Sequence, residues 1–194
     1  KESIDNNIRW ERIRLLGGEP TLHPDFFEII KLFSDYVHKH SPNTTIYLIT
    51  NGFGVSVNNL LQKLPSDIIV QNSNKKTAAQ FFYPFNVAPQ DNPRYRAGDY
   101  EAGCLNSSSN GMALTPYGYY CCGLAGGIDR ILGLDIGRKS LPRHDDELID
   151  HFQTFCKFCG TFASFRLTRK QLTSRSWIKA YEKYKKEKPR LTSF

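Results

Sequence analysis

Three short apolar stretches, separated by segments with helical periodicity, constrain the fold of this chain most strongly. The stretches cover residues 13–16, 45–49 and 68–70, and each is followed by glycine or by small polar residues. Near-continuous apolar strands are typical of a sheet covered on both faces, and strands that alternate with helices pair in parallel through right-handed crossovers. We therefore expect an α/β fold with a parallel sheet.

The segment between the first two expected strands carries helix signals. Pro24 suits the first helical position, Asp25 and Glu28 suit a helix N-terminus, and apolar residues recur at helical spacing at Phe26, Ile30, Phe33 and Val37. A shorter helix is expected over residues 57–64. Residues 1–12 resemble the end of a helix that leads into the first strand.

The pattern changes in the second half of the chain. Residues 84–103 form a connector with three prolines, and Pro116-Tyr117-Gly118 is a turn signal between two strand-like runs, so we expect a β-hairpin there. Apolar spacing predicts a helix from residue 148 towards Cys156. These changes predict a division into residues 1–92, 93–165 and 166–194.

Composition and charge narrow the function classes. With 194 residues, 40% of them hydrophobic, the chain can bury a substantial core. No apolar run is long enough to cross a bilayer and the start lacks a signal-peptide core, so we expect a cytoplasmic protein without a membrane partner.

The positive charge is concentrated at the C-terminal end. Residues 166–194 hold ten lysines and arginines and two glutamates, a net charge of +8, whereas the whole chain carries +7, so the rest sums to −1. In a helix, Trp177, Tyr181 and Tyr184 would share one face among lysines, a pattern that also suits contacts with RNA or an acidic peptide. We expect instead that these aromatics dock on the sheet domain, and that nucleic acid is not a partner.

All five cysteines lie close together in the sequence: Cys104, Cys121, Cys122, Cys156 and Cys159. Intracellular chains rarely form disulfides, and Cys156-Lys157-Phe158-Cys159 has the spacing that turns two thiolates towards one metal. Cys104 and one of the Cys121/Cys122 pair would complete a four-thiolate site, since neighbouring strand residues point to opposite faces. The spacing leaves zinc, a 4Fe-4S cluster and free or redox-active thiols open. His151 would be an alternative ligand, but we expect it to be solvated.

The strand, turn and helix of residues 15–26 resemble the second strand of radical S-adenosylmethionine enzymes, whose Gly-Gly-Glu-Pro motif stands here as residues 17–20. Thr50-Asn51-Gly52 is similar to the companion Thr-Asn-Gly motif of that family. At the carboxyl rim of a parallel barrel, glycines let main-chain carbonyls approach a ligand and a carboxylate pairs with an ammonium group. An ordinary strand-to-helix turn is the alternative.

The resemblance implies a partial parallel (β/α) barrel that binds S-adenosylmethionine. Glu19, helped by the main chain of Gly17 and Gly18, would hold the amino group of the methionine part. Ser73 ends the third strand, where the family often places ribose contacts, although a turn cap explains it equally well. The implied cofactor-binding residues are Gly17, Gly18, Glu19, Pro20, Thr50, Asn51 and Ser73.

The second half resembles the twitch extension of the same family, a shorter relative of the SPASM extension, which holds an auxiliary 4Fe-4S cluster. Both have an isolated first cysteine, a hairpin in which a glycine precedes the second cysteine, and a closing Cys-x-x-Cys. This resemblance favours iron–sulfur over zinc and implies a small cysteine-rich hairpin and helix domain with four ligands: Cys104, Cys122, Cys156 and Cys159. The two resemblances together cover most of residues 10–160.

One feature of the family is missing from these residues. The Cys-x-x-x-Cys-x-x-Cys motif, which holds the cluster that cleaves S-adenosylmethionine, is expected before Gly17, but no cysteine precedes Cys104. We therefore expect either a fragment, with a second 4Fe-4S cluster on an absent N-terminal segment, or a degenerate member that cannot start a radical. As given, the 194 residues are not expected to cleave S-adenosylmethionine.

These observations predict a radical S-adenosylmethionine enzyme in its complete form. A 5′-deoxyadenosyl radical would abstract hydrogen from an unidentified small-molecule or peptide substrate, the auxiliary cluster would accept an electron or anchor the substrate, and a reductant would serve the clusters. The alternative is a non-catalytic binding or structural protein with a four-cysteine zinc site.

Overall fold

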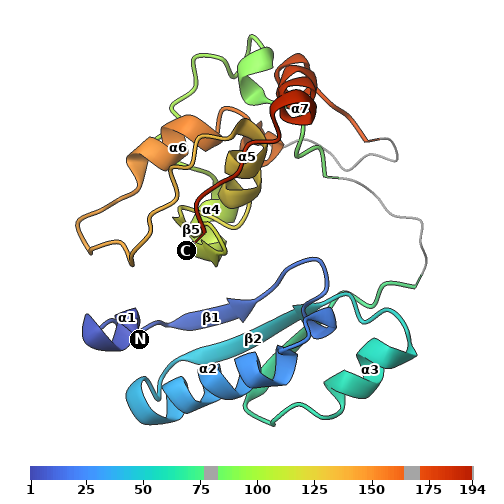
Figure 1. Ribbon diagram of the computed structural model, residues 1–194, viewed down its shortest axis with the longest axis vertical. Helices are drawn as coiled ribbons and strands as arrows, with labels where there is room; N and C mark the ends of the chain where they lie inside the picture. The colour runs from blue at the N-terminus through green and yellow to red at the C-terminus, as the bar shows by residue number, and fades with distance from the viewer. Residues whose placement is uncertain (77–82, 164–170, 194) are drawn as a thin grey trace. The chain divides into compact units, whose positions relative to one another are not determined.

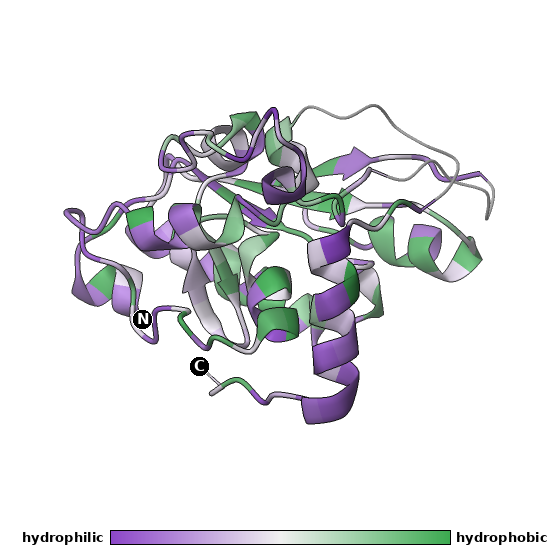
Figure 2. Cartoon of the chain, turned by 90° about the horizontal axis from the view of Figure 1, so that it is seen from above, coloured by the Kyte–Doolittle hydropathy of each residue, from purple (hydrophilic) through white to green (hydrophobic). Residues whose placement is uncertain are grey.

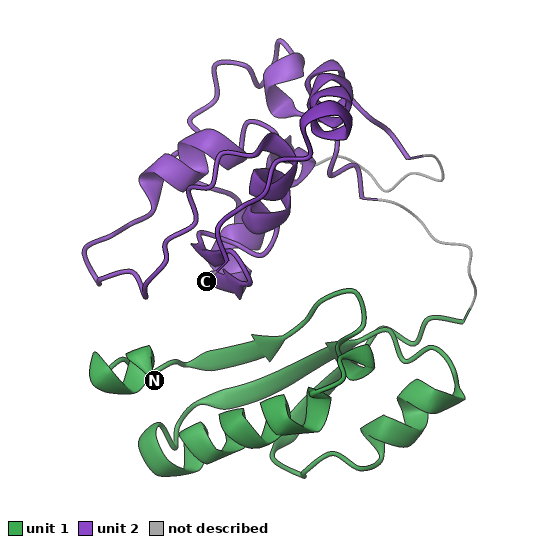
Figure 3. Cartoon of the chain, in the orientation of Figure 1, with its two compact units in different colours: residues 1–79 green, residues 80–194 purple. Residues whose placement is uncertain are grey.

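The computed structural model describes residues 1–76, 83–163 and 171–193. The chain forms two compact units, residues 1–79 and residues 80–194 (Figure 3). The first unit is α/β, as expected, and the second contains a β-hairpin with short helices. Within the described part of the chain, no helix has both the length and the apolar character needed to cross a membrane.

The first unit contains a three-stranded sheet. Its strands are β1 (Arg12–Leu15), β2 (Thr45–Thr50) and β3 (Ile68–Asn72), which pair in parallel in the order β1-β2-β3. The parallel sheet expected from the apolar stretches is therefore confirmed, and the described strands leave it open rather than closed into a barrel.

Both crossover helices of the first unit lie on the same side of this sheet. They are α2 (Phe26–His40) and α3 (Val55–Leu61) (Figure 1). The cause is topological: right-handed crossovers between strands in consecutive order place every connecting helix on one face. Ile46 and Leu48 of β2 pack against Phe26 and Ile30 of α2 in the core of this unit.

The prediction that the sheet is covered on both faces is wrong for the described part of β3. Ile69 is 46% exposed and Val70 is 38% exposed. In β2, buried residues alternate with half-buried ones. The short apolar run of β3 therefore does not mark a doubly covered strand: both crossover helices lie on one face, and β3 is the last strand of the described sheet.

The start of the chain is less helical than expected. The first helix, α1, covers only Glu2–Asp5, and Asn7 then adopts a left-handed conformation with φ of 53°. Asparagine tolerates this conformation better than most residues, and it ends a helix. A short 3-10 helix, η1 (Pro20–Leu22), follows Glu19 and was not expected.

The second unit is built from short elements. In chain order they are η2 (Pro89–Asp91), α4 (Leu105–Asn110), β4 (Ala113–Thr115), β5 (Gly118–Tyr120), α5 (Ala125–Leu132), α6 (Ile149–Phe155), η3 (Gly160–Ala163) and α7 (Arg175–Glu187). The predicted hairpin is present as the antiparallel pair β4 and β5. The helix predicted to begin at residue 148 is α6, whereas α4 and α5 were not predicted.

Gly118 is required at the turn of the hairpin. Its φ is +116°, and a Cβ atom there would lie 2.4 Å from the carbonyl oxygen of Arg138. Tyr119 exchanges two main-chain hydrogen bonds with Arg138, at 2.8 and 3.0 Å. Only a residue without a side chain lets the Arg138 segment pair so closely with β5.

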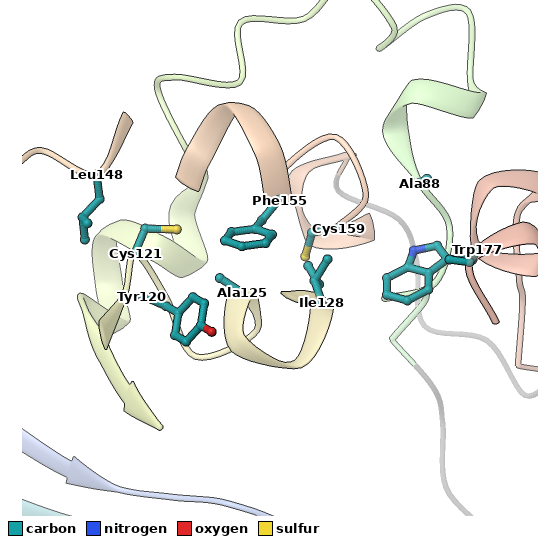
Figure 4. Close-up of a cluster of buried hydrophobic side chains, with 10 residues drawn as sticks. Ala88, Tyr120, Cys121, Ala125, Ile128, Leu148, Phe155, Cys159 and Trp177 are labelled. Carbon is teal, nitrogen blue, oxygen red and sulfur yellow. The ribbon is translucent and has the colours of Figure 1, made fainter. Parts of the chain in front are cut away.

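The core of the second unit gathers around β5, α5 and α6. Figure 4 shows Tyr120, Cys121, Ala125, Phe155 and Cys159 in this cluster, with Phe155 between the two cysteines in that view. The cysteine-rich part of the chain is therefore also the hydrophobic core of this unit.

A buried carboxylate fixes the loop after α5. Asp129 is fully buried and accepts hydrogen bonds from the Tyr120 hydroxyl at 2.7 Å and from the main-chain N–H groups of Leu134, Asp135 and Ile136 at 3.0–3.2 Å. Four donors satisfy a charge that would otherwise be costly to bury.

The basic C-terminal helix packs in the core of the second unit, where Trp177 is buried, and this corrects the expectation that its aromatics are buried on the sheet domain. Trp177 of α7 is 3% exposed and donates its indole N–H to the carbonyl of Phe158 at 2.7 Å. The ring of Tyr181 packs against the ring of Trp177, with their centroids 5.3 Å apart. The lysines of α7 are exposed, and Figure 2 shows this helix as largely hydrophilic. The aromatic face is thus a core contact, as the pattern predicted.

Asp91 of η2 holds the first turn of this helix. Its carboxylate accepts hydrogen bonds from the main-chain N–H of Ser176 at 2.8 Å and from the Ser176 hydroxyl at 2.6 Å. A carboxylate at a helix N-terminus satisfies free amide donors and interacts favourably with the helix dipole.

Candidate functional site

The carboxyl ends of β1 and β2 meet at Glu19. The Glu19 carboxylate accepts hydrogen bonds from the Thr21 hydroxyl at 2.8 Å, from the Thr50 hydroxyl at 2.9 Å and from the main-chain N–H of Asn51 at 2.8 Å. Two sequence motifs that lie more than thirty residues apart are thus joined by direct contacts, with sequence separations of 31 and 32. We call this group, Glu19 with Thr21, Thr50 and Asn51, the Glu19 latch.

The latch favours the charged form of the carboxyl group. Burial raises the pKa of Glu19, but hydrogen bonds from Asn51, Thr21 and Thr50 together outweigh burial and hold this pKa below its usual value. The carboxylate is therefore ionised at neutral pH.

The end of β3 is joined to the same edge. A Cβ atom on Gly52, whose φ is +62°, would lie 2.2 Å from the Asn72 side chain, so a larger residue does not fit there. Ser73 donates to the carbonyl of Thr50 through its main-chain N–H at 3.0 Å and its hydroxyl at 3.3 Å. These contacts continue the pairing of β3 with β2 by one residue, and the two roles suggested for Ser73, a ribose contact and a turn cap, stay predictions.

The turn before Glu19 is open. Gly17 and Gly18 are exposed, and a Cβ atom built on either would have no neighbour within 4 Å. Pro20 begins η1 and positions the loop behind Glu19. The main chain of both glycines is therefore accessible to a ligand.

Apolar side chains surround this edge and were not singled out from the sequence. Four large ones are at least half exposed: Leu16, Leu22, Phe53 and Val55. Each follows or flanks one of the two motifs, and helix α3 packs against η1. For Leu22, Phe53 and Val55 the signal available in the sequence was an apolar residue in a segment expected to be a loop, whereas Leu16 was counted as part of the first strand.

The predicted metal ligands come from three parts of the second unit. Cys104 is the N-cap of α4, Cys122 follows β5, and Cys156 and Cys159 follow α6. Burial raises the pKa of the Cys156 thiol to about 12, with smaller contributions from the negative charges of the other three predicted ligands. Cys156 is therefore within electrostatic range of the other three predicted ligands.

The sulfur atoms do not form a compact ligand set in this arrangement. In the described ranges, no group of three or more histidine, cysteine, aspartate or glutamate side chains is placed to hold a metal ion. A zinc ion would require four sulfurs at about 2.3 Å. The choice of metal stays a prediction.

Thr161 lies between two of these cysteines and was missed in the sequence. Its hydroxyl is 2.9 Å from the Cys159 sulfur and 3.9 Å from the Cys104 sulfur. Because both sulfurs lie within these distances of one oxygen atom, Cys104 and Cys159 are close to each other. A main-chain hydrogen bond from Thr161 also reaches Cys159.

Cys121 and Cys122 differ in their surroundings. The strand β5 ends at Tyr120, so strand alternation does not decide which of the two thiols faces the other cysteines. Cys121 lies in the core, whereas Cys122 is half-buried and accepts hydrogen bonds from Cys121 and from the first N–H groups of the α5 region. The bond from Cys121 lowers the pKa of Cys122 and raises that of Cys121. The more accessible, more acidic thiol is thus the predicted ligand.

His151 is not solvated, contrary to our expectation. Its ring is fully buried between Tyr120 and Phe155, and Nε2 lies 2.9 Å from the carbonyl oxygen of Ile136. The helix α6 turns this residue inward because its position shares a face with Phe155.

Comparison of the chain with models of protein families, with curated proteins and with solved structures found no match in any of the three.

Proposed function

We propose that this chain is part of a radical S-adenosylmethionine enzyme. The first unit would be a partial (β/α) barrel whose carboxyl edge binds the amino group of S-adenosylmethionine, and the second unit would hold an auxiliary 4Fe-4S cluster. The observation that carries the proposal is the Glu19 latch, because it brings both motifs of the resemblance to one point at the ends of adjacent parallel strands.

The topology of the sheet supports the barrel part of the proposal. Consecutive strand order with both crossover helices on one face is the arrangement from which a (β/α) barrel is built. In a doubly wound sheet the strand order reverses and helices cover both faces. Barrel enzymes bind their ligands at the carboxyl ends of the strands, where Glu19, Thr50 and Ser73 lie.

The latch places a negative charge at the open edge of the sheet. A carboxylate offers about four acceptor positions. The N–H and hydroxyl of Thr21, the hydroxyl of Thr50 and the N–H of Asn51 already donate to Glu19, so an ammonium group would share these positions or replace one of the donors. The negative charge of the carboxylate and the open main chain of Gly17 and Gly18 suit the amino group of an amino acid.

The donor set of the second unit supports the auxiliary cluster. Cys159 lies in the core and Cys122 packs against it, while the sulfurs of Cys104 and Cys159 both lie near the Thr161 hydroxyl. A 4Fe-4S cluster distributes its four cysteine ligands over four iron atoms, so it accepts sulfurs farther apart than those around one zinc ion. The thiolate chemistry of Cys104, Cys122, Cys156 and Cys159 suits such a cluster, which would draw the four sulfurs together on binding.

The chain's own contribution would be binding and positioning. When bound, S-adenosylmethionine on a 4Fe-4S cluster supplies a 5′-deoxyadenosyl radical. These residues have no cysteine before Cys104, so the three cysteines of that first cluster are not among them. Glu19 would orient the methionine part, and the second unit would exclude water from the auxiliary cluster.

Two measurements on the chain test the two parts of the proposal separately. After anaerobic treatment with iron and sulfide, we expect a brown protein with about four irons per chain. A colourless protein that binds one zinc would instead support the structural alternative. For the sheet unit, added S-adenosylmethionine should shift the Asn51 amide resonance, and the shift should be lost in Glu19→Gln and kept in Glu28→Gln, which changes an exposed glutamate of α2.

A further inference from the structure

We propose that Thr161 sets the reduction potential of the auxiliary cluster by donating a hydrogen bond to the Cys159 sulfur. This inference rests on the proposed function, since it requires a cluster at the cysteine site. It assigns a role to a residue outside the predicted ligand set.

The geometry around Thr161 singles out its hydroxyl. The residue lies in η3, two positions after Cys159, and its Oγ1 is 2.9 Å from the Cys159 sulfur. The Cys104 sulfur lies 3.9 Å from the same oxygen. One hydroxyl proton thus has two predicted ligand sulfurs within reach, and it can serve one of them at a time.

Ligation determines the direction of this bond. With a protonated thiol, either the sulfur or the hydroxyl can be the donor. A cysteine that binds iron is a thiolate and has no proton to donate. The hydroxyl of Thr161 must then donate, while the main-chain hydrogen bond from Thr161 supports the same sulfur.

The hydrophobic surroundings of Cys159 strengthen the hydrogen bond from Thr161. Cys159 is 6% exposed and belongs to the hydrophobic core. In such a site water does not replace a missing donor, and a hydrogen bond is electrostatically stronger than in water. Donors to the ligand sulfurs withdraw charge from a cluster and favour its reduced state, so they raise its reduction potential.

The test compares three variants of the chain after loading with iron and sulfide. Thr161→Val removes the hydroxyl but keeps the shape, Thr161→Ala removes it with less bulk, and Thr161→Ser keeps it. We expect the reduction potential, measured by a redox titration monitored by electron paramagnetic resonance, to fall in Val and Ala and to stay near the wild-type value in Ser.

Each outcome decides the point. Equal potentials in wild type and Thr161→Val would overturn the inference and leave the proposed function intact, whereas a wild-type chain that takes up no cluster would overturn both. If only the Val and Ala variants fail to load, the hydroxyl is needed to hold the ligand thiolate, which supports its contact with Cys159. If Ser also fails to load, Thr161 acts through packing and the inference is wrong.

Discussion

The Thr50 hydroxyl lies 2.9 Å from both carboxylate oxygens of Glu19 and so ties the end of β2 to the turn after β1. Thr50 is buried and Glu19 is half-buried, and the amide of the next residue, Asn51, adds a further bond to the carboxylate. A residue expected only to bind a ligand therefore also holds the sheet edge together. Changes at Glu19 should affect structure as well as binding.

We expect Glu19→Gln to destabilise the carboxyl edge of the sheet. Glutamine keeps the size but loses the charge, and because its NH2 group accepts no hydrogen bond, a single amide oxygen is left for the donors of Thr21, Thr50 and Asn51. Hydrogen bonds to charged groups contribute about 1.5–3 kcal/mol, so protection of the Asn51 amide against hydrogen exchange should fall by that free energy. Glu28→Gln, at an exposed position of α2, is the control and should leave this protection unchanged.

The same carboxylate predicts a dependence on pH. The pKa of Glu19 is lowered in the folded chain, with the amide of Asn51 and the hydroxyls of Thr21 and Thr50 outweighing burial. The stabilisation is therefore complete above the unfolded pKa of about 4.3 and is lost as the pH falls through the lower folded value. Asn51 protection should decrease with acidification in the wild type. A decrease of the same size in Glu19→Gln would assign the effect to another group.

The cysteines should separate into four ligands and one core residue. We expect Cys104, Cys122, Cys156 or Cys159 to alanine each to lose the cluster, and Cys121→Ala to keep it because Cys121 lies in the hydrophobic core. Elemental analysis of iron and zinc on all five variants provides the measurement. If Cys121→Ala lost the cluster and Cys122→Ala kept it, the hairpin ligand would move by one residue.

Asp129→Asn should strongly destabilise the second unit. An asparagine retains only one carbonyl oxygen for the four donors that Asp129 satisfies, and its NH2 group would face buried N–H groups. Leaving buried donors without an acceptor costs about 1–3 kcal/mol for each group affected. Thermal unfolding measures the loss of stability. The control Asp145→Asn, which changes an exposed carboxylate, should leave the unfolding temperature nearly unchanged.

The C-terminal helix should contribute stability rather than nucleic-acid binding. Replacing the buried Trp177 with alanine should cost about 3–5 kcal/mol in the second unit, because it leaves a cavity and removes the bond to Phe158. Removing residues 174–194 should lower stability further and leave retention on immobilised RNA unchanged. RNA retention that weakens with salt and disappears with the deletion would contradict this view.

Many of the helices and strands were predictable from local sequence patterns. Apolar runs and helical spacing predicted the three parallel strands, α2, the hairpin and α6, because these elements are decided by the periodicity of neighbouring side chains. The aromatic spacing of α7 likewise predicted a buried face. Helix α1 ended sooner than predicted because Asn7 adopts a left-handed conformation.

The short elements around the cysteines could not be predicted in the same way. Helix α4 consists mainly of small polar residues and α5 begins with Ala125, Gly126 and Gly127, so neither carries a clear helical signal in the sequence. His151 was expected to be solvated, and nothing in the sequence singled out Asp129 as a buried residue. Only the packing of α5, α6 and β5 provides the partners that make their burial tolerable.

The sequence alone determined which residues are available for chemistry: one Gly-Gly-Glu-Pro turn, one Thr-Asn-Gly turn and five cysteines. It could not show that Glu19 bonds to Thr50, that Thr161 lies against Cys159 or that α7 docks in the second unit. The Glu19–Thr50 contact depends on strand register, the burial of α7 depends on helix packing, and the Thr161–Cys159 contact depends on the 3-10 turn that the chain forms after Cys159. A hydrogen bond forms only when folding brings donor and acceptor to within about 3 Å, and the tertiary structure alone decides that.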